Sequence, residues 1–439
     1  MDAPRLDPGR RFFAGLLEAL VEVMGTAQGY LFQHGPRVAL LAQDLADELG
    51  VEERLRAELF FAAVLSDVGM IGLVEDAWED PVEVLPPRSR ARVIRHPERS
   101  ASTVREIPYM RGLEPLVRHH HEWWDGSGYP DGLSGLDIPI GARILRLADT
   151  VCALAEPRPH RPALPPDAVH QAVVESAGVE FSPDVVHAFL SLEREGRLRE
   201  FQPGRFHRAC LDAAAALVPA EVSPLSTREF LDIIGALIDA KDAYTAGHSR
   251  RVARLGAAVA DQLTLGAELE RTAFAAGYLH DLGKVSVPVA LLTREGPLDE
   301  AEHRAVRSHA ETGARILERI PSLRHLAPGC RYHHERWDGS GYPEGLSGDR
   351  IPLLGQVLAV CDAYDAMTSG RAYRRGCSHP EAVEELRRAR GTQFSPAIVE
   401  AFTGLPSSVF RSLWSPEETL PRFFGPVADP RRRARTALD

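Results

Sequence analysis

Residues 333–362 read HHERWDGSGYPEGLSGDRIPLLGQVLAVCD, and residues 120–149 read HHEWWDGSGYPDGLSGLDIPIGARILRLAD. The chain therefore contains nearly the same sequence twice, 213 residues apart. Further upstream, at His34 and Asp67, the separation becomes 214. One change of a single residue over about 150 positions indicates a duplicated domain, and two copies of this length predict tandem globular domains rather than a solenoid. The other matched pairs are His96 and His309, Phe181 and Phe394, His34 and His248, and Asp67 and Asp281.

Apolar residues recur with helical spacing in both copies. In the second copy they fall at i, i+3, i+4, i+7 and i+8, which gives one apolar face per helix. The glycine-rich loop after His334 interrupts any helix, and strand-like alternation is scarce. We therefore predict an all-α fold made of two tandem helical bundles. The residues that form these faces are Phe230, Ile233, Ile234, Leu237 and Ile238; Val252, Leu255, Val259 and Leu263; and Val306, Ile316, Leu317 and Ile320.

The repeat predicts the domain boundaries. We expect a first domain over residues 1–202, a linker with one short helix over 203–226, a second domain over 227–415 and a frayed tail over 416–439. The linker is marked by an alanine-rich stretch followed by Pro219 and Pro224. Chain ends that carry many charges and few apolar residues are commonly disordered.

Composition narrows the class of protein. The chain has 439 residues, 44% of them hydrophobic, and a net charge of −11, which argues against nonspecific nucleic-acid binding. No apolar run reaches the ~20 residues that a membrane-spanning helix needs, and no signal peptide is apparent. The five cysteines form no CxxC pair, as expected for reduced residues in the cytoplasm. We expect a cytoplasmic protein with no membrane or nucleic-acid partner.

The second copy gathers a set of potential metal ligands. Imidazole and carboxylate together suit first-row divalent ions such as iron and manganese, and without a thiolate set a structural zinc site is not expected. Neighbouring residues diverge by about 100° on a helix, so His280 and Asp281 face one site only near a helix end or between two metals. Asp281 fits a bridging carboxylate, and seven ligands suit two ions. They are His248, His280, Asp281, His309, His333, His334 and Asp362.

Two divalent ions about 3.5–4 Å apart cleave phosphoesters by supplying hydroxide at neutral pH and holding the phosphoryl oxygens. Lys284, one turn after His280, would add positive charge for a phosphate, and Arg371 and Arg374 would clamp its oxygens. Each of these features has a simpler reading on its own. His333 and His334 could form a solvated helix end, Lys284 and the two arginines could be surface residues, and Tyr342 could only pack within its loop.

From about Phe230 to Phe402 the second copy resembles the HD-GYP family, a subset of the HD superfamily of metal-dependent phosphohydrolases. The resemblance follows the order KDAYTAGHSRRV, LHDLGKVSVP, RSHAETGARIL, HHERWDGSGYPEGLSG, CDAYDAMTSGRAYR and GTQFSPAIVEAF. It implies hydrolysis of cyclic di-GMP to linear pGpG by metal-activated hydroxide, in some members on to GMP, and hence a cyclic-guanylate-specific phosphodiesterase. Some members act on related cyclic dinucleotides, such as cyclic GMP-AMP.

The resemblance also implies roles for single residues. The seven residues named above match metal-ligand positions, and Asp281 and Lys284 match catalytic positions. Lys284 further matches a phosphate-contacting lysine. The remaining substrate-binding positions match Gly341, Tyr342 and Pro343 of the motif that names the family, together with Arg371 and Arg374. Some members hold a third metal through a glutamate that is Tyr244 here, so we expect two divalent ions, iron or manganese.

The first copy lacks two of these groups. Ser66 stands where the second copy has His280, and Met70 stands where it has Lys284. A hydroxyl is a poor ligand beside imidazole, so we expect weak or no catalysis there. Three interpretations stay open: a scaffold or dimerisation domain, a ligand sensor, and residual one-metal catalysis. The retained residues are His34, Asp67, His96, His120, His121, Asp149, Gly128, Tyr129, Pro130, Arg158 and Arg161.

Other functions compete with a cyclic dinucleotide phosphodiesterase. An HD phosphohydrolase for a nucleotide monophosphate or an alarmone is disfavoured by the GYP loop. A receptor that binds cyclic di-GMP without cleaving it is disfavoured by the intact His280, Asp281 and Lys284. A homodimer or a signalling partner stays open, because no recognition motif marks a partner.

Overall fold

The computed structural model of the chain describes residues 34–70, 84–106, 110–158, 161–198, 202–217, 247–292, 296–369 and 376–413, together with single positions within 11–19 and 228–238 and at 294. Over these residues the structure is helical, with four isolated β-bridges and no strand. The prediction of an all-α fold is confirmed. Arg371, Arg374 and Tyr244 lie outside the described residues, as do Phe230, Ile233 and Leu237.

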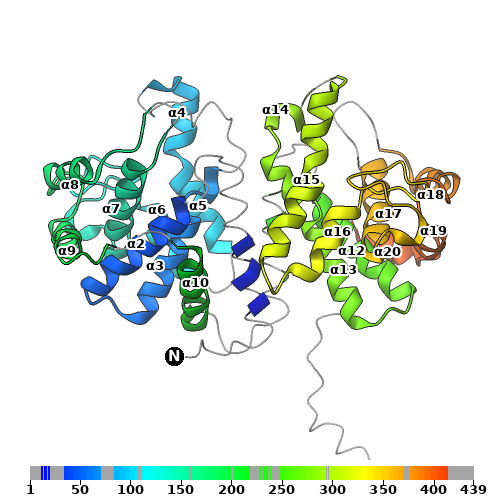
Figure 1. The fold of residues 1–439 in the computed structure, drawn as a ribbon, viewed down its shortest axis with the longest axis horizontal. Coiled ribbons are helices and arrows are strands. Elements are labelled where there is room, and N and C mark those ends of the chain that lie inside the picture. The colour runs from blue at the N-terminus through cyan, green and yellow to red at the C-terminus, as the bar shows by residue number, and fades with distance from the viewer. Residues whose placement is uncertain are drawn as a thin grey trace, which may run out of the picture.

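The first copy forms one helical unit, on the left in Figure 1. Its counterpart to the GYP loop lies between α6 and α7, with one 3-10 turn, η6(Gly135–Asp137). The remaining elements are α2(His34–Glu48), α3(Glu53–Leu65), η2(Val68–Met70), α4(Pro87–Ile94), α5(His96–Glu106), η5(Arg111–Leu113), α6(Glu114–Arg118), α7(Ile140–Ala155), α8(Pro166–Glu175) and α9(Pro183–Arg194).

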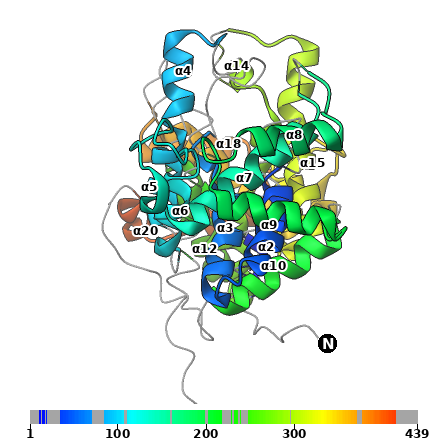
Figure 2. The ribbon, with the colours of Figure 1, turned by 90° about the vertical axis from the view of Figure 1, so that its left-hand side faces the viewer.

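The second copy forms the unit on the right in Figure 1, and its elements repeat this order. In Figure 2, where the first unit faces the viewer, α4 and α14 stand at the same end of the molecule. The elements are α12(His248–Gln262), α13(Ala267–Leu279), η7(Leu282–Ser286), α14(Val289–Leu292), α15(Glu300–Arg319), η8(Arg324–Leu326), α16(Ala327–Tyr332), η9(Gly348–Arg350), α17(Leu353–Thr368), α18(His379–Arg388), α19(Pro396–Thr403) and α20(Ser407–Ser412).

The apolar faces expected from the sequence form the core. Val252, Leu255 and Val259 of α12 are buried, as are Ile316 and Leu317 of α15. Helix α15 starts at a capping box, in which Asp299 accepts from the backbone N–H of Glu302 and the Glu302 side chain accepts from the backbone N–H of Asp299. Such a box satisfies two N–H groups that a helix end leaves without partners. The long helix that carries His309 is thereby fixed at its first turn.

Residues 203–226, expected to be a linker with one short helix, begin with the 15-residue helix α10(Pro203–Leu217). This helix packs on α3, where the rings of Phe206 and Phe60 stack with centroids 5.4 Å apart. Nearer the N-terminus, residues around Gly15 lie between the two units (Figure 1), and a Cβ added at Gly15 would lie 2.1 Å from Oγ of Ser322. The first copy therefore touches the second through this N-terminal segment. Among the described helices, none is long and apolar enough to span a membrane.

Candidate metal centre

Two three-residue clusters of potential metal ligands face each other in the second copy. One consists of His248, His280 and Asp281, the other of His309, His333 and His334, and within each cluster the ligand atoms lie within 4.8 Å of one another. Asp362 joins the first cluster, with Oδ1 3.3 Å from Nε2 of His248. The seven residues singled out in the sequence are thus brought together, although they come from α12, α15, α17 and the ends of α13 and α16.

Asp281 connects the two clusters. Its Oδ2 lies 3.4 Å from Nε2 of His280, and its Oδ1 lies 3.4 Å from Nε2 of His309. Oδ1 is buried and accepts no hydrogen bond from the described residues. A buried carboxylate oxygen without a partner is costly unless a cation meets it. The donor set therefore fits two divalent ions with Asp281 between them.

Three histidines are oriented by the same hydrogen bond. Nδ1 of His280, His309 and His333 lies 2.8, 2.7 and 2.7 Å from the carbonyl oxygen three residues earlier. Since a carbonyl only accepts, each Nδ1 carries the proton and each Nε2 keeps its lone pair. Nε2 of His309 lies 3.4 Å from Nε2 of His333. Lone pairs directed at one another in this way are the arrangement that a metal ion needs.

His248 is held by a carboxylate instead of a carbonyl. Its Nδ1 lies 2.8 Å from Oδ2 of Asp365, and Arg251 donates from Nε to Oδ1 of the same Asp365 at 2.5 Å. Burial opposes protonation of His248, but the hydrogen bonds to Asp362 and Asp365 outweigh it and raise its pKa to about 10. A carboxylate behind a ligating histidine fixes its ring and its tautomer. Asp365 was not singled out in the sequence.

Burial keeps the second cluster neutral. Burial, and after it the nearby His309, lowers the pKa of His334 to about 3. Burial lowers the pKa of His333 as well. For Asp281 burial acts in the opposite direction, but the charges of Lys284 and His280 outweigh it and hold the carboxyl pKa well below its usual range. At neutral pH the cluster of His309, His333 and His334 therefore offers imidazole lone pairs, and Asp281 offers an ionised carboxylate.

Two glycines bring Asp281 and His309 together. His280 caps the C-terminal end of α13 and Asp281 caps the start of η7, so both lie near a helix end, one of the two places that the sequence argument allowed. A Cβ on Gly283 would lie 1.9 Å from the carbonyl oxygen of His309, and one on Gly313 would lie 2.4 Å from Sγ of Cys330. Any side chain at either position would push η7 away from α15. Gly313 lies within α15, where glycine is otherwise unfavourable, and is needed for this close approach.

Lys284 and Tyr342 border the centre. Nζ of Lys284 lies 2.7 Å from Oδ2 of Asp281. The ring of Tyr342 stacks on His334 with centroids 4.8 Å apart and planes 27° apart. At Gly341 an added Cβ would lie 2.3 Å from the backbone nitrogen of Arg336, so only glycine allows this loop conformation. Burial raises the pKa of the Tyr342 phenol, which stays protonated.

Two further residues shape the loop, and neither was singled out in the sequence. Glu335 is buried and accepts backbone N–H groups of Glu344 and Leu346 at 2.8 and 3.0 Å. Its signal was the HHE run, which occurs in both copies. Arg307 lies on α15 with its guanidinium carbon 5.1 Å from the centroid of the Tyr342 ring. It adds a second cation beside Lys284, whereas Arg371 and Arg374 fall outside the described residues.

The first copy keeps one of the two clusters. His96, His120 and His121 form a cluster like that of His309, His333 and His334. The counterpart of the other cluster has changed. Nε2 of His34 lies 2.8 Å from Oδ1 of Asp149, and Nδ1 lies 2.9 Å from Oε2 of Glu156. Where the second copy has His280, Ser66 bonds to the carbonyl of Ala63.

Arg158 and Arg161 of the first copy form hydrogen bonds with backbone groups of the same copy. Arg161 donates to the backbone carbonyls of Ala153 and Leu154, at 2.5 and 3.1 Å. Arg158 exchanges two backbone hydrogen bonds with Arg161. Arg161 therefore braces the end of α7, and this weakens the hypothesis that these two arginines clamp a nucleotide in a sensor.

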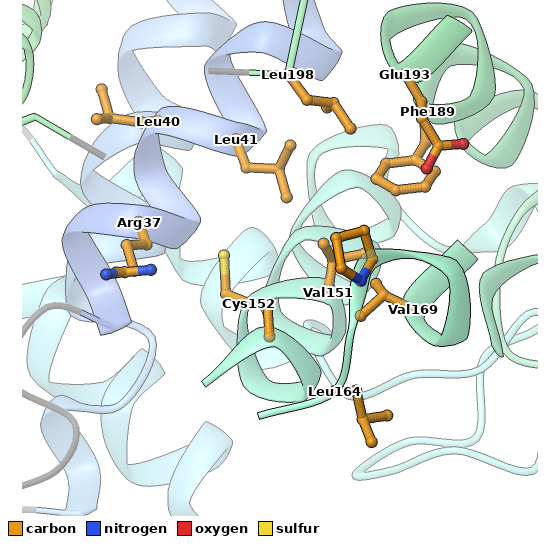
Figure 3. A pocket seen from close by; sticks show the side chains of 12 residues that line it. Arg37, Leu40, Leu41, Val151, Cys152, Leu164, Val169, Phe189, Glu193 and Leu198 are labelled. Carbon is orange, nitrogen blue, oxygen red and sulfur yellow. The ribbon is translucent and has the colours of Figure 1, made fainter. Parts of the chain in front are cut away.

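An apolar cavity of about 250 Å³ opens in the first unit between α2, α7, α8 and α9 (Figure 3). Cys152 and Phe189 line it. In the second copy the equivalent space is filled, because Phe410 of α20 packs against Tyr364 and Phe402. The cavity thus marks a place where the two copies differ in packing rather than in chemistry.

Comparison with known proteins identifies the family. The HD domain family matches residues 21–185 and 232–398. A 3′3′-cGAMP-specific phosphodiesterase of Vibrio cholerae is 31% identical over 329 residues, which cover 73% of this chain and 70% of that protein. A cyclic di-GMP phosphodiesterase of Pseudomonas aeruginosa, PA4108, is 35% identical over 278 residues, which cover 62% of this chain and 63% of that one.

The fold matches a solved structure over both units. The crystal structure of a cyclic GMP-AMP-specific phosphodiesterase of Vibrio cholerae superposes with a TM-score of 0.62 at 24% identity, covering 90% of this chain and 98% of that one. The family match extends over both repeats. In the second repeat, the histidine and aspartate residues described above converge on one site. The chain therefore belongs to the HD superfamily of phosphohydrolases and carries two HD domains of HD-GYP type in tandem.

Proposed function

We propose that the second HD domain is a cyclic dinucleotide phosphodiesterase that hydrolyses cyclic di-GMP to linear pGpG. The observation that carries the proposal is Asp281, a buried carboxylate whose two oxygens face two separate histidine clusters. Such a site is suited to a pair of divalent ions, and a pair of ions supplies a nucleophile at neutral pH and neutralises charge on a phosphoryl group. Iron and manganese are the ions that this donor set favours.

The residues around the ions have separate roles in the proposal. Lys284, held 2.7 Å from Asp281, would pair with a phosphate oxygen as negative charge develops on it. Arg307, whose guanidinium carbon lies 5.1 Å from the centroid of the Tyr342 ring, would draw the second phosphate toward the site. Tyr342 offers a rigid aromatic face at the mouth of the centre. Arg371 and Arg374 remain candidates for clamping phosphate oxygens.

A second candidate substrate is the hybrid 3′3′-cyclic GMP-AMP. One observation favours it. The Vibrio cholerae relative that is specific for this compound aligns over 329 residues, more than a single copy of the repeat. Both compounds are cyclic dinucleotides with two phosphodiesters, so one metal centre would serve either.

The test uses the full chain, purified without oxygen and loaded with Fe(II) or Mn(II). Cyclic di-GMP and 3′3′-cyclic GMP-AMP are supplied in parallel, and products are separated by chromatography. A linear dinucleotide supports the proposal, and the faster substrate sets the specificity. If neither substrate is cleaved while two ions are bound to the second domain, the proposal is wrong. Binding of cyclic di-GMP without cleavage would indicate a receptor.

A further inference from the structure

The cluster retained in the first copy has no role in the proposed activity. We propose that His96, His120, His121 and Asp67 bind a single divalent cation, so that the degenerate domain is a one-metal domain rather than a metal-free one. The ion would be a first-row cation of the type that imidazole and carboxylate share, such as Mn(II) or Fe(II). The site is separate from the centre built around Asp281.

His96 and His120 of the first copy are oriented as His309 and His333 of the second. Nδ1 of His96 and of His120 each lies 2.6 Å from the carbonyl oxygen three residues earlier, so each Nε2 keeps its lone pair. These two Nε2 atoms lie 3.3 Å apart, against 3.4 Å for His309 and His333. Two lone pairs at this separation repel one another unless a cation lies between them.

The carboxylate is present as well. Oδ1 of Asp67 lies 3.2 Å from Nε2 of His96, and the corresponding distance from Asp281 to His309 is 3.4 Å. The close contact between the segment after Asp67 and the helix that carries His96 is also retained, with Ser100 in place of the second glycine. A Cβ on Gly69 would lie 2.6 Å from the carbonyl oxygen of His96, and the backbone N–H of Gly69 donates to Oγ of Ser100 at 2.8 Å. The first copy therefore keeps both the ligands and the contact that positions them.

The residues that would bind a second ion in the first copy are paired with one another or replaced. His34 and Asp149, the counterparts of His248 and Asp362, are hydrogen-bonded directly at 2.8 Å, whereas the latter pair is 3.3 Å apart. Ser66 directs its hydroxyl to a backbone carbonyl at 3.1 Å. Both ring nitrogens of His34 are thus paired with carboxylates, and among the described residues no imidazole takes the place of His280. The stoichiometry expected for the first domain is therefore one.

Arg146 lowers the affinity of the proposed site for a metal ion. It donates to Nδ1 of His121 at 2.8 Å and to Oε1 of Glu180 at 2.5 Å, and Ala359 occupies its place in the second copy. A guanidinium beside a ligand repels a divalent cation and holds one nitrogen of His121. We therefore expect the ion to bind more weakly here than at Asp281, and removal of Arg146 to strengthen binding.

The test counts bound Mn(II) on the full chain. A background variant, His280→Ala with His309→Ala, removes one histidine from each cluster of the second domain. We expect this variant to bind one Mn(II) by calorimetry and elemental analysis, and to bind none when His96→Ala is added. The Arg146→Ala change in the same background should tighten Mn(II) binding about tenfold, as expected for removal of a nearby like charge.

The outcomes separate this inference from the proposed function, because no activity is measured. Circular dichroism and the Tm confirm that each variant is folded. One Mn(II) that disappears with His96→Ala supports the site. A folded background variant that binds no Mn(II), or one ion that persists with His96→Ala, overturns it. An unchanged affinity in Arg146→Ala would remove His121 from the ligands and so contradict the four-residue site, even if His96→Ala fails to fold.

Discussion

The two histidine clusters of the second copy and the single cluster of the first differ by very few residues. His96 and His120 have the geometry of His309 and His333, with nearly the same separation between Nε2 atoms. On the other side of the aspartate, Ser66 replaces His280 and Met70 replaces Lys284. A duplicated metal site can thus lose one half while the other half stays assembled, since each half rests on its own helix contacts.

The carboxylate that hydrogen-bonds to His248, and to its counterpart His34, shows a different kind of change between the two copies. His248 is held by Asp365, whereas His34 is held by Glu156, which aligns with Ser369 one turn further along the helix. The position of Asp365 is occupied by Cys152 in the first copy. A carboxylate behind this histidine has been kept although its place in the sequence has moved. The partner of a ligand is therefore visible only in the structure.

The largest effect should come from the residue that joins the clusters. Asp281→Ala removes a carboxylate oxygen from both proposed ions, so turnover of cyclic dinucleotide should fall at least about a thousandfold. Initial rates at saturating Mn(II) measure the loss. Asp349→Ala, which removes an exposed carboxylate of the same domain, serves as the control and should keep its rate. A rate within tenfold of the parent would exclude Asp281 from the site.

Exchange of the lysine for the residue of the first copy should have the next largest effect. Lys284→Met should lower kcat about a hundredfold, because it removes a cation where negative charge develops. Met70→Leu, a change of similar volume at the buried position of the first copy, is the matched control. Equal losses in the two variants would show that the effect comes from packing rather than from the charge.

The third prediction concerns the support of His248. Asp365→Ala should weaken metal binding about 10- to 100-fold, since the ring loses the carboxylate that orients it. Mn(II) titration followed by elemental analysis measures the change. Because the buried Arg251 would then lose its carboxylate partner, the Tm should fall as well. Cys152→Ala at the aligned position should leave metal binding at Asp281 as it is, and a loss there would indicate coupling between the units.

The smallest effect is expected at the ring of Tyr342. Arg307→Ile introduces the residue found at the aligned position in the first copy, Ile94. An exposed cation–π contact contributes about 0.5–1 kcal/mol, so KM should rise about two- to fivefold with little change in kcat. Arg304→Ile on the same helix removes an exposed arginine that pairs with Glu300. If both variants raise KM equally, general surface charge accounts for the effect.

Much of the architecture could be predicted from the repeat. Helical spacing in two copies was enough for an all-α tandem fold, and the alignment of His and Asp residues identified the groups that converge in the structure. Because adjacent residues on a helix diverge, the sequence required His280 and Asp281 to lie near a helix end or between two metals, and the structure places Asp281 at a helix end between the two clusters. The domain boundaries at 202, 226 and 415 stay predictions, although α10 packs on the first unit.

The remainder depended on contacts between distant segments. Asp365 was hidden because its aligned residue is Cys152, so comparison of the copies gave no signal. Arg146 and Ala359 differ visibly in the alignment, but only the fold shows that a guanidinium at this place contacts His121. Glu335 belongs to the visible HHE run, but its role in shaping the loop depends on the backbone N–H groups of Glu344 and Leu346, nine and eleven residues later.

The most direct test of the central claim is the rate of linear dinucleotide formation by the full chain and by its His280→Ser variant, both loaded with Mn(II) without oxygen. The variant gives the second copy the residue of the first. We predict rapid cleavage by the parent chain and loss of both one bound ion and nearly all turnover in the variant. Equal rates in the two proteins would contradict the account, because catalysis would then not depend on the two-cluster centre.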